Sequence, residues 1–367
     1  MKVVLSGGGT AGHINPSLAL AEVLRAEGDE VLFAGTPQGI EERLVKQAGI
    51  PFMAFEAAGF NRQRPWTLVT SSWTIMRSAR KARAWLSAEK PDAVVGFGGY
   101  VCIPVCMAAE KLGIPVVLHE QNSVMGMANK SLSKTAAAVA LTYGEAAEAV
   151  ADRSKVVVTG NPVRASVLSA TREQGRRLLR IPEDAVVLLV FGGSLGARHI
   201  NEAVASLKDR LLAVEGLHVV HITGPKEFEA ACGALALSPE ESLRWHVMAY
   251  QDRMAETLAA ADCVLSRAGA TSLAEIAALG IPALLVPFPY ATGDHQTMNA
   301  RSYVEAGAAF TVADDELSTP DFERKLFSLV EDAALRSRMH EAASKLPARD
   351  AAANLADVVR RCAKAAE

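Results

Sequence analysis

The sequence predicts an α/β protein made of two doubly wound, parallel-sheet domains. Short runs of β-branched residues alternate with longer helical patterns, which is typical of βαβ units. The combination of an apolar strand, a glycine-rich turn and a helix occurs twice, beginning near residues 2 and 185. A single sheet containing all of these strands would be unusually wide, and a chain of 367 residues, half of them apolar, is long enough for two domains.

The elements follow this scheme along the chain. The strands expected in the first domain are 2–6, 30–35, 92–98, 114–120 and 155–160, and those in the second are 185–191, 217–224, 261–266, 281–288 and 308–312. Gly160 and Pro162 break regular structure, so we place the hinge there, with one domain at 1–162 and the other at 163–347. No strand follows the last helices, and we expect the helix within 348–367 to return and complete the first domain.

Composition restricts the class of protein. A net charge of -3 argues against a nucleic-acid binder, which normally has a basic excess. The five cysteines include no C-x-x-C pair, and Cys102 and Cys106 are expected to be buried structural thiols. The first residues lack the pattern of a signal peptide, and no apolar run approaches the ~18 residues that span a bilayer. We therefore expect an intracellular, soluble protein, attached at most to a membrane surface.

The first glycine turn, "SGGGTAGHINP" at residues 6–16, satisfies G-x-G-x-x-G. A dinucleotide site also needs an acidic residue at the end of the second strand, to hold the adenine ribose. Gly35 and Thr36 stand there instead, and Asp29 and Glu30 precede the strand. Two interpretations remain, a tight turn without function and a cradle for another phosphate. His13 lies where helix N–H groups favour negative charge, although a histidine there is more often a capping or core residue.

A second turn, "FGGSLGAR" at residues 191–198, has the same composition. Gly192, Gly193 and Gly196 permit close approach of the backbone, and Ser194 adds a hydroxyl donor. Two glycine cradles, one at the edge of each sheet, indicate two anionic groups that meet across a cleft. A single dinucleotide requires only one.

Other strand ends also carry polar residues. "LHEQN" (118–122) and "GFGGY" (96–100) follow apolar strands, at the sheet edge where open α/β folds bind ligands. Ser272 and Glu275 have the spacing of a capping box, and Glu275 is equally well placed to accept hydrogen bonds from a ribose diol. In "YATGDHQTMNA" (290–300), we expect Asp294 to cap the next helix and His295, Gln296 and Asn299 to face the cleft.

A set of motifs in a fixed order resembles one known family. The motifs are "GGGTAGH", "GFGGY", "HEQN", "GNPVR", "FGGSLGAR" and "SRAGATSLAEIAALGIPALLVPFPYATGDHQTMNA". Together they resemble the MurG family of bacterial peptidoglycan N-acetylglucosaminyltransferases, which have the GT-B fold of two Rossmann-like domains facing a cleft. The likeness extends from the first strand to about Gly307. It implies transfer of N-acetylglucosamine from UDP-GlcNAc to the 4-hydroxyl of the muramyl-pentapeptide on undecaprenyl diphosphate.

The resemblance also assigns residues to the two substrates. It places the donor on residues 163–347 and the lipid-linked acceptor on residues 1–162. Donor contacts are implied for the ribose (Glu275), the diphosphate (Ala270, Thr271, Ser272, Ser194, Arg164), the sugar (Gln296, Asn122) and the uracil (backbone at Tyr250), and also for Thr10 and Gly12. Acceptor contacts are implied for Gly8, Gly9, His13, Gly98, Gly99, Tyr100, His119 and Glu120.

The implied chemistry is a displacement at the anomeric carbon. His13 is expected to act as the general base, while Arg164, Ser194 and the helix N-termini stabilise the departing diphosphate. No D-x-D motif or histidine cluster is present, and His218 and His221 lie three residues apart on a predicted strand and so face opposite sides. We therefore expect an inverting, metal-independent transfer that forms a β-1,4 linkage and uses no cofactor.

Residues 62–86 mix aromatic and basic side chains. This composition suits an anionic membrane surface, although a helix with one solvated face and one core face has similar features. We expect a cytoplasmic protein, peripheral on the inner face of the cell membrane, with proteins of cell-wall synthesis as further partners. The residues concerned are Trp66, Trp73, Ile75, Met76 and Trp85 together with Arg77, Arg80, Lys81 and Arg83.

Three alternatives remain, two of them from other classes of protein. Another GT-B glycosyltransferase with a lipid acceptor, such as a diacylglycerol glycosyltransferase, would share the fold but not "HEQN". A nicotinamide-dependent oxidoreductase is disfavoured by the missing acidic residue after the second strand. A catalytically silent nucleotide-sugar-binding protein could keep Glu275 and Gln296 without needing His13.

Overall fold

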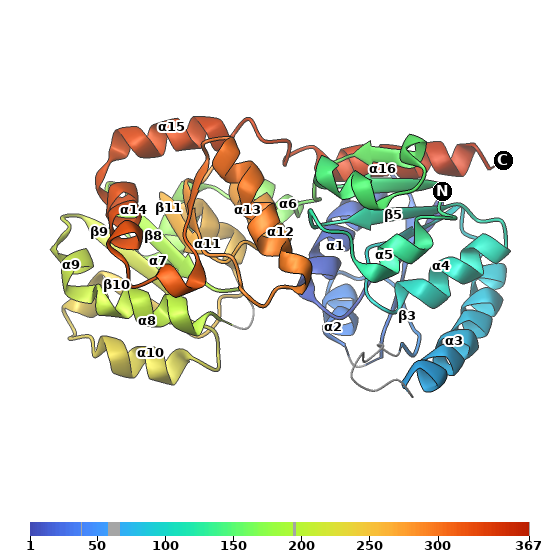
Figure 1. Ribbon diagram of the computed structural model, residues 1–367, viewed down its shortest axis with the longest axis horizontal. Helices are drawn as coiled ribbons and strands as arrows, with labels where there is room; N and C mark the ends of the chain where they lie inside the picture. The colour runs from blue at the N-terminus through green and yellow to red at the C-terminus, as the bar shows by residue number, and fades with distance from the viewer. Residues whose placement is uncertain (38, 58–66, 194–195, 367) are drawn as a thin grey trace. The chain divides into compact units, whose positions relative to one another are not determined.

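The chain folds into two compact units, each built around its own sheet (Figure 1). The computed structural model describes residues 1–37, 39–57, 67–193 and 196–366. The first unit consists of Met1–Arg164 and Pro347–Glu367, and the second of Ala165–Leu346. The boundaries expected from the sequence were 162 and 348.

The sheet of the first unit is entirely parallel, and within the described residues it has the strand order β3-β2-β1-β4-β5-β6-β7. Its strands are β1 (Lys2–Ser6), β2 (Glu30–Gly35), β3 (Phe52–Ala54), β4 (Ala93–Gly96), β5 (Val116–Glu120), β6 (Ala138–Leu141) and β7 (Val156–Val158). Its helices are α1 (Ala11–Ala26), α2 (Ile40–Gln47), α3 (Thr67–Glu89), α4 (Cys102–Lys111), α5 (Met127–Leu132) and α16 (Ala351–Lys364), with short 3-10 turns η1 (Gly144–Ala149) and η2 (Arg153–Lys155). The strand order changes direction between β1 and β4, which makes this the switch point where open α/β sheets bind ligands.

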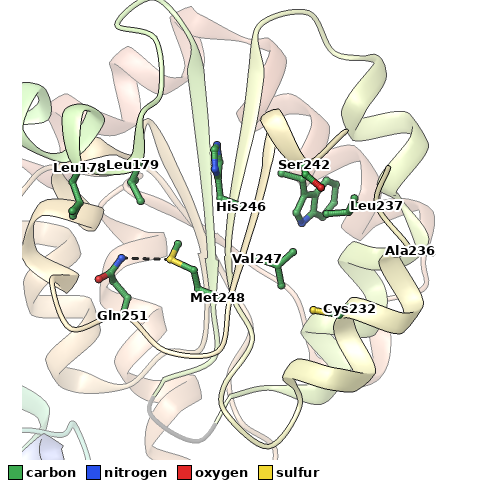
Figure 2. A pocket seen from close by; sticks show the side chains of 11 residues that line it. Leu178, Leu179, Cys232, Ala236, Leu237, Ser242, His246, Val247, Met248 and Gln251 are labelled. Carbon is green, nitrogen blue, oxygen red and sulfur yellow. Dashed lines mark hydrogen bonds between the residues drawn. The ribbon is translucent and has the colours of Figure 1, made fainter. Parts of the chain in front are cut away.

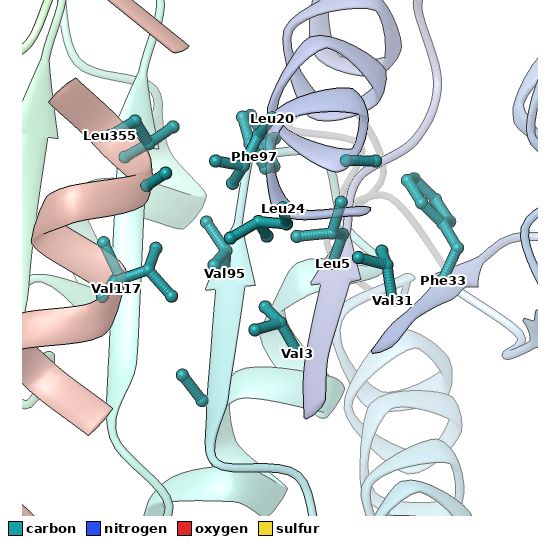
Figure 3. Packing of buried hydrophobic residues seen from close by; sticks show 14 of the residues in the cluster. Val3, Leu5, Leu20, Leu24, Val31, Phe33, Val95, Phe97, Val117 and Leu355 are labelled. Carbon is teal, nitrogen blue, oxygen red and sulfur yellow. The ribbon is translucent and has the colours of Figure 1, made fainter. Parts of the chain in front are cut away.

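Helices α1 and α16 cover one face of this sheet. Figure 3 shows Leu20 and Leu24 of α1 above Val3 of β1, with Leu355 of α16 near Val117 of β5. Because strand side chains alternate, Val4 points to the opposite face and joins a second core with α3 and α4. Each fully buried side chain of this kind contributes about 1.5–3 kcal/mol.

The second unit repeats the arrangement with the strand order β10-β9-β8-β11-β12-β13 over its described residues. The strands are β8 (Val186–Phe191), β9 (Leu217–Ile222), β10 (Trp245–Met248), β11 (Cys263–Ser266), β12 (Ala283–Leu285) and β13 (Ala309–Thr311). The helices are α6 (Ala165–Leu168), α7 (Arg172–Leu179), α8 (Arg198–Ser206), α9 (Lys208–Ala213), α10 (Phe228–Leu235), α11 (Met254–Ala260), α12 (Ala270–Ala278), α13 (His295–Glu305), α14 (Pro320–Glu331) and α15 (Ala333–Ala343). Short 3-10 turns are η3 (Glu241–Leu243), η4 (Thr292–Asp294) and η5 (Asp314–Glu316). Its switch point lies between β8 and β11.

Two doubly wound parallel sheets confirm the predicted fold class. The strands expected from the sequence do not include β3, β6 or β10. β3 has only three residues, all half-buried, and β6 reads "AVAL", whose alanines are weak strand formers. β10 lies at the edge of its sheet.

In the part of the chain that the structure describes, no helix has an apolar stretch long enough to cross a bilayer.

Candidate functional site

The loops after β1 and β4 touch at the switch point of the first unit. Gly9, Gly98 and Gly99 have φ values of 86°, 100° and 82°, in the left-handed region that favours glycine. A Cβ on Gly99 would lie 2.6 Å from the carbonyl oxygen of Gly8, so the two loops can approach this closely only through glycine. Both predicted acceptor loops therefore come together at one point of the sheet edge.

His13 is the third residue of α1 and points toward the β4 loop. Its Nδ1 atom lies 2.9 Å from the carbonyl oxygen of Gly8, and a carbonyl can only accept. Nδ1 of the neutral ring therefore carries the proton, and the lone pair is on Nε2. A Cβ on Gly98 would lie 3.1 Å from Nε2, which places this nitrogen beside the glycine loop. The arrangement orients His13 as a proton acceptor.

The N-terminus of α1 opens into the same place. Thr10 is the N-cap residue, and its side chain makes no capping bond within the described residues. Its hydroxyl oxygen lies 3.3 Å from Nδ1 of His13 instead. Gly12 is half-buried in the first turn. The helix dipole makes this end electropositive, which suits an anionic ligand.

His119 lies within β5, inside the expected strand 114–120, and its side chain points into the protein. The side chain is fully buried, with Nε2 donating to the carbonyl oxygen of Gly160 and Nδ1 accepting from the amide of Gln121, both at 3.0 Å. Burial lowers the pKa of His119 to about 4, so the ring is neutral at pH 7. Both ring nitrogens bond within the protein, so this geometry gives no support to the acceptor contact expected of His119.

Glu120 is the last residue of β5, as expected, but its side chain is only 3% exposed. Its Oε2 accepts from the Asn129 amide at 2.9 Å and from the backbone N–H of Gly126 at 3.0 Å. Its Oε1 accepts from the backbone N–H of Asn122 at 3.2 Å. Glu120 therefore shapes the loop that carries Asn122.

Tyr100, by contrast, is 41% exposed and accessible to a ligand.

Two buried residues, Cys102 and Glu41, hold these loops and were not predicted as part of the site. Cys102 and Cys106 are buried free thiols, as predicted. The Sγ of Cys102 also lies 2.9 Å from the carbonyl oxygens of both Ser6 and Gly98. Burial raises its pKa to about 11, so the thiol remains a donor that bridges the two loops.

Glu41 of α2 is the second such residue, and its side chain is fully buried. Its Oε1 accepts from the backbone N–H of Thr36 at 3.2 Å and from the Thr36 hydroxyl. A Cβ on Gly8 would lie 2.7 Å from the same oxygen. An acidic group thus reaches the end of β2 from six residues along the chain, but it is bonded to the protein and supports the glycine turn. Because Glu41 lies six residues beyond the end of β2, no sequence motif indicated it.

In the second unit, residues 192–193 and 196–197, which follow β8, and the loop at 267–269, which follows β11, flank the switch point between the two strands. Ser194 lies outside the described residues. Gly196 has a φ of 81°, and a Cβ there would lie 2.2 Å from the carbonyl oxygen of Thr223. The turn thus requires glycine at this position.

Helix α12 begins at Ala270, with Gly269 as its N-cap residue. Ser272 is therefore inside the first turn, and the capping-box interpretation of Ser272 with Glu275 is wrong. Ala270, Thr271 and Ser272 supply the first backbone N–H groups of the helix, which suit an anion. Glu275 lies on the next turn and is half-buried.

Gln296 on α13 connects two loops at the same edge. Its Oε1 accepts from the backbone N–H groups of Ala268, at 3.1 Å, and Phe288, at 2.9 Å. Asp294 is the N-cap residue of α13, and its carboxylate accepts from the Thr297 hydroxyl at 2.7 Å. Asn299 is fully buried, which contradicts the expectation that its side chain faces a cleft.

Two other predicted donor residues, Arg164 and Tyr250, do not lie in the loops around α12 and α13. Arg164 ends the first unit, and its Nε donates to Oε1 of Glu22 at 2.5 Å. Tyr250 follows β10 and is 55% exposed. His218 and His221 alternate on β9 as expected and have different partners, His246 and Asn201.

A pocket of about 690 Å³ lies along β10, the edge strand of the second sheet (Figure 2). Figure 2 shows His246 and Met248 on one side of the strand and Val247 on the other, as alternation along a strand requires. Its described lining contains none of the predicted site residues, and we assign it no ligand. The lining residues are Leu178, Leu179, Cys232, Ala236, Leu237, Ser242, Trp245, His246, Val247, Met248 and Gln251.

Comparison with known proteins gives two family matches. The model of the glycosyltransferase family 28 N-terminal domain matches residues 3–141. The model of the glycosyltransferase family 28 C-terminal domain matches residues 187–355. Each match falls largely within one of the two units.

Curated relatives match over nearly the whole chain. Proteins of Halothermothrix orenii (40% identical, covering 94% of this chain and 95% of that protein) and Bacillus subtilis (39% identical, covering 99% and 100%) bear the same name. That name is UDP-N-acetylglucosamine–N-acetylmuramyl-(pentapeptide) pyrophosphoryl-undecaprenol N-acetylglucosamine transferase. Among solved structures, Acinetobacter baumannii MurG superposes with a TM-score of 0.73 at 30% identity, covering 98% of this chain and 99% of that one.

Proposed function

The chain belongs to glycosyltransferase family 28, and from this premise we propose that it transfers N-acetylglucosamine from UDP-GlcNAc to the undecaprenyl-diphosphate-linked muramyl-pentapeptide. The protein is a UDP-GlcNAc-dependent glycosyltransferase of peptidoglycan synthesis with the GT-B fold. One observation carries this conclusion. Relatives that bear the name of this reaction are 36–40% identical over 94–99% of the chain.

The second unit is proposed to hold the donor. The N-terminus of α12, at Ala270, Thr271 and Ser272, presents backbone N–H groups that suit the diphosphate. The carboxylate of Glu275 suits a ribose diol, which donates two hydrogen bonds. Because Oε1 of Gln296 already accepts two backbone N–H groups, its amide nitrogen is the group that we assign to the sugar hydroxyls. Further contacts are proposed for Thr10, Gly12, Asn122, Arg164, Ser194 and the backbone at Tyr250.

The first unit is proposed to hold the acceptor, with His13 as the general base. Nε2 of His13 accepts the proton of the 4-hydroxyl, whose oxygen attacks the anomeric carbon of the donor. The bond from that carbon to the diphosphate breaks on the opposite side, so the configuration inverts and UDP leaves. Gly8, Gly9, Gly98, Gly99 and Tyr100 are the groups proposed to surround the acceptor.

Stabilisation of the leaving diphosphate is proposed to come from helix N-termini and Arg164, without a metal ion. Within the described residues, no group of three or more His, Cys, Asp or Glu side chains could hold a metal. We expect full activity in excess chelator. Loss of activity that added Mg²⁺ or Mn²⁺ restores would contradict a metal-independent reaction.

The exposed face of α3 is proposed to contact the inner membrane surface. Trp73 and Met76 are 66% and 57% exposed, and Arg77, Arg80 and Arg83 are exposed beside them. Two other residues of the predicted patch contact the rest of the first unit: Trp85 is half-buried with its ring 5.5 Å from that of Phe55, and Lys81 donates to the carbonyl oxygen of Ala54. Trp66 lies outside the described residues.

The test is a transfer assay with the purified chain, labelled UDP-GlcNAc and a short-chain lipid acceptor. We expect a lipid-linked disaccharide and one equivalent of UDP, with a β-linkage by NMR of the new anomeric proton. Turnover of UDP-GlcNAc that does not depend on the acceptor, by hydrolysis or epimerisation, would contradict the proposal.

A further inference from the structure

A single carboxylate in the second unit connects loops that follow four different strands. Asp314 lies just after β13, and its side chain is only 7% exposed. Its Oδ1 lies 2.5 Å from Nη1 of Arg267, which directly follows β11. Its Oδ2 lies 2.5 Å from Nδ1 of His199, the second residue of α8, and α8 follows the glycine turn after β8.

Arg267 extends the connection to the loop after β12. Its Nη1 donates to the carbonyl oxygens of Val286 and Pro287, both at 3.2 Å, while its contact with Asp314 is an ion pair. The guanidinium carbon lies 5.5 Å from the centre of the Phe288 ring. The Arg267 side chain is 11% exposed, so these carbonyl oxygens and the carboxylate of Asp314 compensate its charge in place of water.

The connected loops carry the groups assigned to the donor. Ala268 and Gly269 lead from Arg267 into the first turn of α12. Gln296 accepts from the backbone N–H groups of both Ala268 and Phe288, so its position depends on the separation of the two loops that Arg267 holds. His199 links the start of α8 to Asp314. Its side chain is 58% exposed, so this contact is expected to stabilise the arrangement less than the contact of Arg267 does.

We propose that Asp314 is a positioning residue for the donor site, acting through Arg267 and His199 to set the spacing of the start of α8 and the loops after β11 and β12. This inference rests on the proposed function, because it concerns the same donor site. Asp314 is not assigned to any donor group, and it acts by fixing the backbone that carries those groups. No motif reveals it, because Asp314 and His199 are 115 residues apart in sequence.

The test compares Asp314→Asn with the wild-type chain. Asparagine preserves the shape of the side chain but leaves the guanidinium of Arg267 without a counter-charge. We expect the KM for UDP-GlcNAc and the Kd for UDP, measured by titration calorimetry, to rise about tenfold. The KM for the lipid acceptor remains at the wild-type value, which a general loss of folding would not produce.

Asp315→Asn is the matched control, because Asp315 is the exposed neighbour and is expected to leave every parameter unchanged. If Asp314→Asn does not fold, His199→Ala decides instead, since it removes one arm at an exposed side chain and is expected to raise the donor KM by about two- to threefold. An unchanged donor KM in the deciding variant overturns the inference while the proposed function stands. A wild-type chain that neither binds UDP nor transfers sugar overturns both.

Discussion

At the scale of single residues, the geometry of His13 leads to a prediction about catalysis. Its Nδ1 is committed to the carbonyl oxygen of Gly8, so Nε2 is the atom that can accept a proton. His13→Ala is expected to lower kcat by about 10²- to 10⁴-fold, the usual contribution of a general base. The Kd for UDP should stay unchanged, because His13 is not assigned to the nucleotide. The measurement is single-turnover transfer to a short-chain lipid acceptor.

His13→Gln provides the control for structure, because glutamine can still donate to Gly8 but cannot act as a base. We expect it to be as inactive as the alanine variant. Near-normal turnover of either variant would exclude His13 as the base.

The polar residues at the end of β5 were only partly predictable from the sequence. Their position at a sheet edge was predictable from the apolar strand before them. The burial of His119 and Glu120 was not predictable, because both are polar residues that stay inside only through hydrogen bonds to distant partners. Their partners, among them Gly160 and Asn129, lie 41 and 9 residues away in sequence. Long-range hydrogen bonds of this kind leave no local pattern.

At the scale of elements, a buried arginine holds α7 against the sheet of the second unit. The Arg176 side chain is 0% exposed, and its Nη2 donates to Oδ2 of Asp262 at 2.7 Å. Its Nη1 donates to the carbonyl oxygens of Pro182 and Ala185. Arg176→Met is expected to lower the free energy of unfolding of this unit by about 3–5 kcal/mol, because it leaves buried acceptors without a donor.

Arg172→Met is the matched control. Arg172 pairs with the other oxygen of Asp262 at 2.6 Å, but its side chain is 43% exposed. Exposed pairs contribute about 0–1 kcal/mol, so this variant should be close to wild type in urea unfolding followed by circular dichroism. Equal losses in the two variants would show that burial of Arg176 is not what makes its contacts important.

Helix α3 gives a prediction about membrane binding. Ser78, Ala82 and Leu86 face the interior, which leaves the other side of the helix to the solvent. Reversing the charges of Arg77, Arg80 and Arg83 to Glu is expected to weaken binding to phosphatidylglycerol-containing vesicles by at least about a hundredfold, at about 1 kcal/mol for each basic residue lost. Vesicle co-sedimentation measures the effect.

The control for this experiment reverses three exposed arginines of the second unit, Arg177, Arg301 and Arg324. It changes the net charge by the same amount and should leave vesicle binding nearly unchanged. Binding that survives the α3 reversal, or that both triple variants weaken equally, would exclude α3 as the membrane contact.

At the scale of the whole molecule, the sequence predicted the duplicated architecture better than the connections within it. Two glycine turns, each after an apolar strand, were enough to indicate two sheets, because parallel strands need crossover helices and glycine permits the tight turn into them. Glu41, Cys102 and Asp314 were not identified as parts of the site. Each acts through contacts that depend on the folded chain, such as the 96 residues between Cys102 and Ser6.

The buried histidines predict that acid destabilises the second unit more than the first. Burial lowers the pKa of His119 in the first unit to about 4, and it does the same to His218 and His221 in the second. Burial also lowers the pKa of His246, beside His218. Each ring binds its proton more weakly in the folded chain than in the unfolded one, so the unfolded state gains protons first as the pH falls below about 6.5. Stability is therefore fully present near pH 8 and is lost progressively toward pH 4.

His221 allows the size of this effect to be measured. Its Nε2 donates to Oδ1 of Asn201 at 3.0 Å, and its buried Nδ1 has no hydrogen-bond partner within the described chain, so a second proton there would be unsatisfied. A pKa of about 4 corresponds to a loss of about 2 kcal/mol at pH 5 relative to pH 8. His221→Gln keeps a donor for Asn201 but cannot titrate. Hydrogen exchange of the β9 amides, corrected for the intrinsic rate, should therefore show about 2 kcal/mol less acid destabilisation in this variant, and an identical pH dependence in both chains would contradict the assignment.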